Sequence, residues 1–401
     1  MNRRFIDARL ADGLCAILSG IIHKIQIHKR DHQGESNYTK PKASLLKLAL
    51  FWFRLSIRLC SWTFLVGLGL LMLGFHLVGQ SNLTTAALMY LPPWLWILPS
   101  LLLLPATLLF DWKSFIAVLL AILFYGMFHM GYQPTVFSNA SIVARMPNSI
   151  RVLSWNRGQS RGVSLQPLKS ELMPHFILLQ DAGRRFESYR NNPEYAEFRD
   201  VVSSSEFTLL SRWPVLASES LAFSAPAASG ISHPAAARFE VAAESGPIVI
   251  YSVHLHTPRG ALESYKHGSF IYGVVGLPGT PWGEKRKIYQ SFWDLQMTVA
   301  KEIADRIKKE NAPVIVAGDF NTPAFGPLYG SFSEFLMDVH QEAGKGFGFS
   351  FPGNSKSVFT LRRPWLRLDQ IFVSSQWEVL NSATIQANAQ HLPVFADIRL
   401  R

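Results

Sequence analysis

Two long stretches without a charged side chain most constrain how this chain can fold. No Asp, Glu, Lys or Arg occurs between Arg58 and Asp111, or between Lys113 and Arg145. A membrane-spanning helix needs about 20 mainly apolar residues, and uncharged runs of this length rarely suit the surface of a water-soluble domain. We therefore predict about three membrane-spanning helices, at Leu59 to Gly79, about Leu88 to Phe110 and about Phe115 to Gly131.

Charge is unevenly divided on the two sides of these predicted spans. Residues 1–58 hold 11 Lys and Arg against 4 Asp and Glu, whereas residues 150–401 hold 26 against 23. Basic segments next to a span stay on the cytoplasmic side of the membrane. The sequence therefore predicts a basic cytoplasmic arm (1–58), a transmembrane region (59–131), a linker (132–149) and an extracytoplasmic C-terminal domain (150–401).

The middle predicted span is the weakest, because Pro92, Pro93 and Pro99 interrupt it. If this segment does not cross the bilayer, two spans would leave the domain in the cytoplasm, and this alternative remains open. Residues 61–401 contain no cysteine, so an exported domain would fold without disulfides. That is compatible with an integral protein of a bacterial inner membrane.

Several short apolar runs after residue 150 end in a polar side chain. The clearest, Val314-Ile315-Val316, is typical of a buried strand and leads into Gly318-Asp319-Phe320-Asn321. Because side chains alternate along a strand, Asp319 and Asn321 would leave it on the same side. Three other predicted strands end likewise, at Asn156, at Asp181, and at His254 followed by His256. Asp369 and His391 lie in two further segments of this kind, 367–373 and 391–394.

This order and spacing resembles the endonuclease/exonuclease/phosphatase superfamily of metal-dependent phosphoesterases. The resemblance covers roughly residues 150 to 401, and it includes a predicted amphipathic helix at 284–309 immediately before the Asp-Phe-Asn strand. It implies an α/β fold in which two mixed β-sheets pack face to face with helices outside, as in DNase I. It also implies a hydrolase that uses Mg²⁺ or Mn²⁺.

The resemblance assigns catalytic roles to five residues. Asp319 would orient or deprotonate the attacking water, and Asn321 would hold that water or a phosphoryl oxygen. His391 would stabilise the pentacoordinate phosphorus, while Asp369 would pair with His391, fix its tautomer and raise its pKa. His254 would be a second phosphate contact. Each of these residues could instead have a purely structural role. Asp369, for example, could form an ion pair with a nearby arginine.

The same resemblance implies the ligands of substrate and metal. Asn156, His256 and Arg238 are the predicted phosphate contacts, and Asp181 and Gln390 stand where the family has metal-side acidic residues. Both positions depart from the family, which usually has Glu in place of Asp181 and Asp in place of Gln390. Because Mg²⁺ prefers carboxylate oxygens, the two changes predict weaker or altered metal binding, or a loss of activity.

The substrate is less constrained. Membrane-tethered members of this layout, the teicoplanin-resistance type, are thought to act on polyprenyl pyrophosphate, so the resemblance favours a phosphate-containing lipid. An extracytoplasmic nuclease would require a basic track, which the nearly neutral domain does not favour. A degenerate, non-catalytic envelope module is the other alternative. The apolar segment from Tyr265 to Trp282 could contact lipid or pack locally.

Overall fold

The computed structural model describes residues 41–134, 146–158, 162–221, 234–356 and 361–401. The chain divides into two compact units, Met1–Leu55 and Ser56–Arg401. Of the first unit the structure describes only the start of helix α2 (Pro41–Leu77). Most of the predicted basic arm (1–58) and most of the predicted linker (132–149) lie outside the described residues.

In the part of the chain that the structure describes, three helical stretches are long and apolar enough to cross a membrane. They are Leu45–Leu77, Pro93–Phe110 and Trp112–His129. The first begins earlier than its predicted start at Leu59, because the helix continues through basic residues. The second begins at Pro93 rather than Leu88, since proline is favoured at the start of a helix. The elements of the last two stretches are η2 (Pro93–Ile97), α4 (Ser100–Phe110), α5 (Trp112–Phe124) and η3 (Tyr125–His129).

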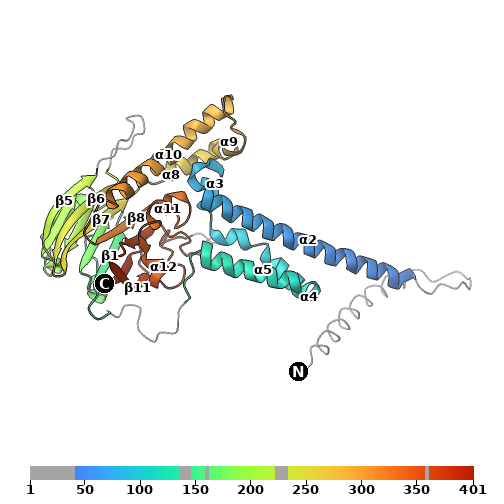
Figure 1. Cartoon of the computed structure of the whole chain (residues 1–401), viewed down its shortest axis with the longest axis horizontal. Coiled ribbons are helices and arrows are strands. Elements are labelled where there is room, and N and C mark those ends of the chain that lie inside the picture. Colours follow the sequence, from blue (N-terminus) through green and yellow to red (C-terminus); the bar gives the residue numbers. More distant parts are fainter. Residues whose placement is uncertain (1–40, 135–145, 159–161, 222–233, 357–360) are drawn as a thin grey trace, which may run out of the picture. The chain divides into compact units, whose positions relative to one another are not determined.

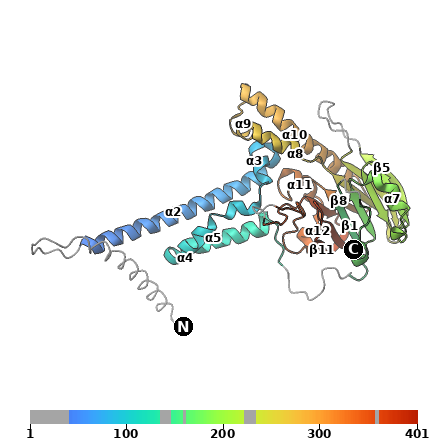
Figure 2. The same cartoon turned by 180° about the vertical axis from the view of Figure 1, so that it is seen from behind.

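Residues 150–401 form two six-stranded sheets with helices outside (Figures 1 and 2). The first sheet has the order β11-β12-β1-β2-β4-β3 and the second β5-β6-β7-β8-β10-β9. The fold is thus the predicted two-layer α/β sandwich. The strands are β1 (Ile150–Asn156), β2 (Phe176–Gln180), β3 (Asp200–Ser204), β4 (Phe207–Ser211), β5 (Val215–Leu221), β6 (Ala236–Ala243), β7 (Gly246–His254), β8 (Val314–Asp319), β9 (Met337–Asp338), β10 (Asp369–Val373), β11 (Trp377–Thr384) and β12 (Val394–Leu400).

Alternating side chains build separate apolar layers on the two faces of each sheet. In β1, Val152 points into the core between the sheets, where it joins residues such as Ile250 and Ile315 of the second sheet. The next residue, Leu153, packs on the outer face with short helices such as α6 (Leu168–Leu172). Because both faces are covered, β1 is buried from Arg151 to Asn156, and its one charged side chain, Arg151, is paired with Asp397 at 2.7 Å.

Helix α10 (Pro281–Ile307) corresponds to the helix predicted at 284–309. Its C-terminal half buries Val299, Ile303 and Ile307 against the outer face of the second sheet. Its first turns extend past the sheet, and Ile288 on the predicted apolar stripe is 69% exposed. The remaining helices of the domain include α7 (Phe186–Arg190), α8 (Arg259–Glu263), α9 (Ser269–Val275), α11 (Pro327–Ser333) and α12 (Val339–Ala343).

Strand register brings the polar strand ends together. Strand β8 lies between β7 and β10, and Asp319 is paired with His254 on one side and with Asp369 on the other. The residue before it is Gly318, with φ of 153°. A Cβ at this position would lie 1.8 Å from the carbonyl oxygen of Val253 in β7. Glycine is therefore required for β7 and β8 to approach each other beside Asp319.

The segments that leave the first and third apolar helices both contact the domain formed by residues 150–401. After α2, the side chain of Gln80 donates a hydrogen bond from Nε2 to Thr322 Oγ1 at 2.8 Å. After η3, the carbonyl oxygen of Gly131 lies 3.0 Å from Nε2 of the buried His340 on α12. The segment after the first apolar helix therefore lies next to the loop that follows Asp319 and Asn321, and the segment after the third lies next to α12.

Candidate active site

Asp319 lies at the centre of the polar strand ends and is fully buried. Its Oδ2 accepts a hydrogen bond from Asn156 Nδ2 at 2.9 Å, and its Oδ1 accepts one from the backbone N–H of Asn321 at 2.8 Å. Asn321 has a φ of 47°, which asparagine tolerates better than most residues. Burial raises the pKa of the Asp319 carboxyl, although the nearby His391 opposes this shift. A carboxylate so placed is suited to accept a proton.

His391 and Asp369 form a close pair beside Asp319. His391 Nδ1 lies 2.9 Å from Asp369 Oδ2 and 3.5 Å from Asp319 Oδ2. Burial disfavours the charged imidazole, but the two carboxylates outweigh it and raise the pKa of His391 to about 9. The arginine alternative does not hold for Arg367, whose guanidinium pairs with Asp338 at 2.9 Å. The Asp369–His391 pair leaves Nε2 of the imidazole available to a substrate oxygen.

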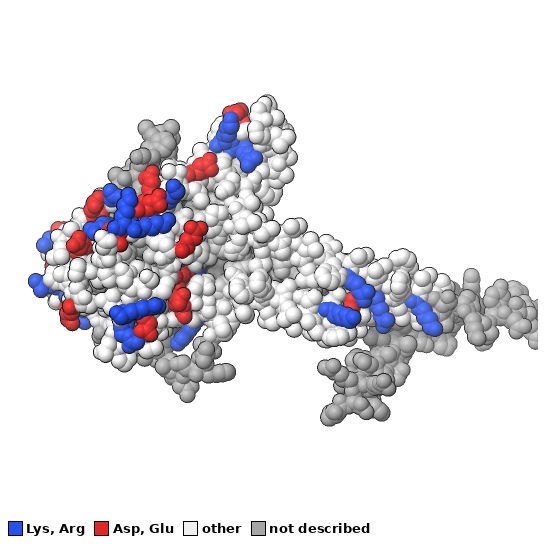
Figure 3. Space-filling model, in the orientation of Figure 1, with Lys and Arg blue, Asp and Glu red and all other residues white. Residues whose placement is uncertain are grey.

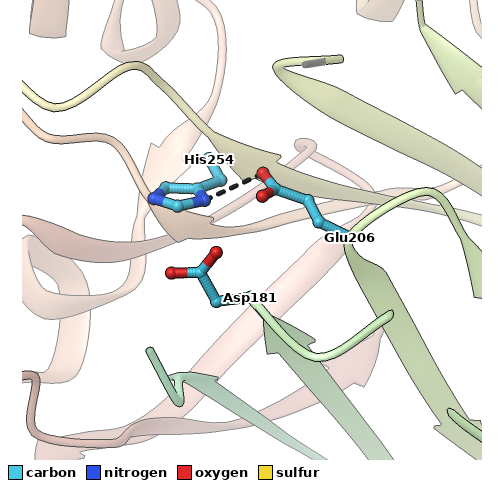
Figure 4. A group of neighbouring side chains, drawn as sticks. All are labelled: Asp181, Glu206 and His254. Atoms are coloured by element: carbon cyan, nitrogen blue, oxygen red, sulfur yellow. Dashed lines mark hydrogen bonds and ion pairs between the residues drawn. The ribbon is translucent and has the colours of Figure 1, made fainter. Parts of the chain in front are cut away.

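A second group of side chains faces the first: Asp181, Glu206 and His254 (Figure 4). His254 Nδ1 lies 2.9 Å from Glu206 Oε1, and its Nε2 lies 3.7 Å from Asp319 Oδ2. Burial opposes protonation, but the hydrogen bond to Glu206 and the charge of Asp319 raise the pKa of His254 to about 9. The sequence analysis did not identify Glu206 as part of the site.

Backbone contacts hold Glu206 in this place. It lies in the turn between β3 and β4, and its carbonyl oxygen accepts hydrogen bonds from the N–H groups of Ala182 and Gly183 at 2.9 and 3.0 Å. A Cβ on Gly183 would lie 1.8 Å from the carbonyl oxygen of Ser205, so glycine is needed for this close approach. The loop after β2 is therefore attached to the hairpin, which sets the Glu206 carboxylate beside Asp181.

Apart from Asp369, which lies behind His391, these residues line one open pocket of about 1480 Å³. The predicted site residues on its wall are Asn156, Asp181, His254, His256, Asp319, Asn321, Gln390 and His391. Gln390 is exposed at this wall. Arg238 does not line the pocket, because its position on β6 directs its Nε to Glu310 Oε1 at 2.7 Å. The structure therefore does not bring Arg238 together with the other predicted phosphate contacts.

The pocket also contains residues that the sequence analysis missed. Four basic side chains belong to its wall: Arg184, Arg185, Arg259 and Lys266. Tyr90 lines it from the segment between the first two apolar helices, and its hydroxyl donates to the carbonyl oxygen of Asn321 at 2.8 Å. Trp365 is beside it, donating from Nε1 to the Tyr90 carbonyl at 3.2 Å. The contacts of Tyr90 with Asn321 and Trp365 could not be predicted from local sequence patterns, because they join segments hundreds of residues apart.

The model of the endonuclease/exonuclease/phosphatase family matches residues 170–390. The chain belongs to this family.

No curated protein matches the sequence. Similar solved structures include humanized D. rerio TDP2 with 14 mutations, at 16% identity and a TM-score of 0.43, covering 63% of this chain and 99% of that one. A family protein from Bacteroides thetaiotaomicron has 12% identity and a TM-score of 0.43, covering 67% and 98%. The 3'-5' exonuclease NExo from Neisseria meningitidis has 14% identity and a TM-score of 0.41, covering 62% and 100%.

The residues of this family member fit a divalent metal ion. One possible ligand set comprises Asp181, Glu206 and His254, and another comprises Asp319, Asp369 and His391; within each set the ligand atoms lie within 4.8 Å of one another. The two sets together hold four carboxylates and two imidazoles. Even with both imidazoles charged, two negative charges remain, which a divalent cation would neutralise.

Proposed function

We propose that this protein is a membrane-tethered, divalent-metal-dependent phosphohydrolase that acts on a lipid-linked phosphate or pyrophosphate at the extracytoplasmic face. The observation that carries the proposal is the composition of the pocket wall. The wall joins the residues of the family's catalytic motifs to Tyr90, which lies between two helices apolar enough to span a membrane. A pocket with such a wall opens close to the membrane surface, where phosphate headgroups are concentrated.

The side chains would divide the hydrolysis among them. Asp319 takes a proton from the attacking water, whose oxygen forms the new bond to phosphorus. The bond from phosphorus to the leaving oxygen breaks, and that oxygen takes a proton from solvent. His391, held by Asp369 at 2.9 Å, donates a hydrogen bond from Nε2 to a phosphoryl oxygen. His254, oriented by Glu206, contacts the phosphate from the other side.

Asp181 and Glu206 are the residues that we propose hold Mg²⁺ or Mn²⁺. Their carboxylate oxygens are the donors that such hard cations prefer. When bound, the ion would neutralise charge on the phosphoryl oxygens and the leaving oxygen. Glu206 supplies a carboxylate that offsets the two departures from the family, the shorter Asp181 and the neutral Gln390. The departures therefore do not require a loss of activity.

Two other functions are less well supported. A nuclease would need a continuous basic surface for the nucleic-acid backbone, whereas residues 150–401 carry 26 Lys and Arg against 23 Asp and Glu. A non-catalytic module would have no need to keep Asp319 and the pair of His391 with Asp369 in the buried arrangement described above. The basic side chains of the pocket wall are few, which suits one phosphorylated headgroup rather than a polymer.

Hydrolysis by the purified full-length chain, measured as phosphate release or as cleavage of the substrate, would test the proposal. The substrates would be a prenyl pyrophosphate, a phosphodiester lipid and DNA, each with Mg²⁺, with Mn²⁺ and with a chelator. We expect hydrolysis of a lipid substrate that the chelator abolishes. Asp319→Asn and His391→Ala should each lower turnover by roughly 10² or more, and Asp369→Asn by less, because it leaves the imidazole in place.

Thermal unfolding of each variant would serve as the control for folding. Cleavage of DNA alone would favour the nuclease. No activity on any substrate with either metal would contradict the hydrolase proposal and favour a non-catalytic module. Near-normal turnover of Asp319→Asn would show that the assigned site is wrong.

A further inference from the structure

A helical lobe between β7 and β8 exposes large apolar side chains. We define the apolar lobe as residues 264–288, which include η7 (Ser264–His267), α9 and the start of α10. Val274 is 65% exposed, Leu277 64% and Ile288 69%. The other exposed large apolar side chains of the lobe are Phe270, Ile271, Val275 and Trp282. Single exposed apolar residues are ordinary, but a group of this size within one lobe marks a contact surface.

The opposite face of the lobe is fixed to the rest of the protein. Ser269 is buried, and a Cβ on Gly273 would lie 2.5 Å from Thr84 Oγ1, so α9 packs closely on α3 (Leu83–Met89). Asn82 Nδ2 donates to the carbonyl oxygen of Gly273 at 2.8 Å. From the sequence, this segment could either contact lipid or pack locally. The structure shows that its inner face packs locally on α3. The apolar outer face is held in place with no described residue covering it.

The lobe lies next to the point where the chain leaves the first apolar helix. Only the short η1 (Gly79–Ser81) separates that helix, Leu45–Leu77, from α3. Tyr265 also binds this segment, since its hydroxyl donates to the carbonyl oxygen of Leu83 at 2.9 Å. Figures 1 and 2 both show α9 and the start of α10 beside α3. The exposed face is thus attached to the end of a helix that can span a bilayer.

Charge on the lobe matches an anionic lipid surface. Lys266, Lys285, Arg286 and Lys287 lie within it, against one carboxylate, Glu284. Figure 3 shows Lys and Arg side chains near the tip of the lobe beside a larger surface without charge. Apolar side chains with basic residues and a tryptophan at their edge are typical of segments that lie in the interface of a membrane.

We propose that the outer face of the apolar lobe is embedded in the headgroup region of the membrane that the N-terminal helices span. The lobe would thereby hold the pocket, to which its Lys266 contributes, close to the lipid surface. A second copy of the chain is a poorer occupant, because two lobes with an excess of positive charge would repel each other. The inference concerns placement of the lobe and does not depend on which substrate the pocket hydrolyses.

Lipid quenching of a fluorescent label would test this placement. The full-length chain, with Cys15 and Cys60 replaced by serine, would carry a single environment-sensitive label at Val274→Cys. The matched control is Lys301→Cys, an exposed position on the later turns of the same helix α10. Both proteins would be reconstituted into nanodiscs of zwitterionic and anionic lipids, with and without a nitroxide on the upper part of the acyl chain.

We expect nitroxide lipids to quench the label at position 274 at least about twofold more than the label at position 301, because an interfacial segment lies at the depth of the upper acyl chain. Equal, weak quenching at both positions would overturn the proposal. Emission from position 274 that is shifted to the blue but not quenched by lipid would also overturn it, and would indicate a protein partner. Neither result depends on hydrolysis, so a failure here is distinguishable from a failure of the proposed function.

Discussion

At the residue scale, the carboxylate of Glu206 adds a possible metal ligand next to Asp181. The sequence shows a shorter Asp181 and a neutral Gln390 where the family has longer or charged groups. The structure adds Glu206 from a hairpin turn, 2.9 Å from His254 and beside Asp181. A carboxylate from another part of the chain can replace the charge that is missing at Gln390.

Removal of the Glu206 charge should therefore weaken metal binding. We expect Glu206→Gln to raise the dissociation constant for Mn²⁺ about tenfold or more, because one negative charge next to the cation is lost. The binding would be measured by electron paramagnetic resonance of free Mn²⁺. Glu187→Gln, on the exposed surface of α7, is the matched control and should leave the constant unchanged. An unchanged constant in Glu206→Gln would exclude Glu206 as a metal ligand.

Four of the motif residues could be predicted from sequence because each stands at the end of an apolar run that forms a strand. Asn156, Asp181, His254 and Asp319 all stand at such strand ends, and parallel or antiparallel neighbours bring strand ends together. Glu206 could not be predicted, because a charged residue in a polar turn is ordinary and its value depends on the contact with the loop after β2. The structure does not bring Arg238 to the pocket, and the sequence could not show this because its partner, Glu310, is distant along the chain.

At the scale of elements, the two apolar layers of the sandwich follow from strand periodicity, whereas the connections to the N-terminal helices do not. Helix α12 shows such a connection, because its His340 is buried against the carbonyl oxygen of Gly131. Burial, together with the nearby charge of Arg367, lowers the pKa of His340 to about 4, although Asp338 opposes the shift. The neutral imidazole is therefore the form that belongs to the folded protein.

Acid should weaken this connection in a defined range of pH. An unfolded histidine has a pKa of about 6.5, so between about pH 6.5 and pH 4 the unfolded state binds a proton that the folded state does not. The free energy of unfolding should fall by a few kcal/mol as the pH drops through this range. His340→Gln, which keeps a hydrogen-bond donor but does not titrate, should show a smaller fall in melting temperature. Identical pH profiles for both proteins would contradict the assignment.

At the scale of the whole molecule, the arrangement across the membrane is a prediction from charge and hydropathy. Three candidate spans and a basic N-terminal segment imply that the C-terminus is exported. A C-terminal alkaline phosphatase fusion should therefore be active, and a green fluorescent protein fusion should be dark. The opposite pair of results would place the catalytic domain in the cytoplasm and support the alternative with two spans.

The central claim is that the pocket receives a phosphate from the bilayer in which the protein is anchored. The most direct measurement compares kcat/KM for a long-chain prenyl pyrophosphate in the same nanodisc as the full-length enzyme with that for a water-soluble short-chain analogue. The account predicts a preference for the long chain of at least about tenfold, because the shared membrane raises the effective substrate concentration. Equal values for the two substrates, or a higher value for DNA than for either, would contradict it.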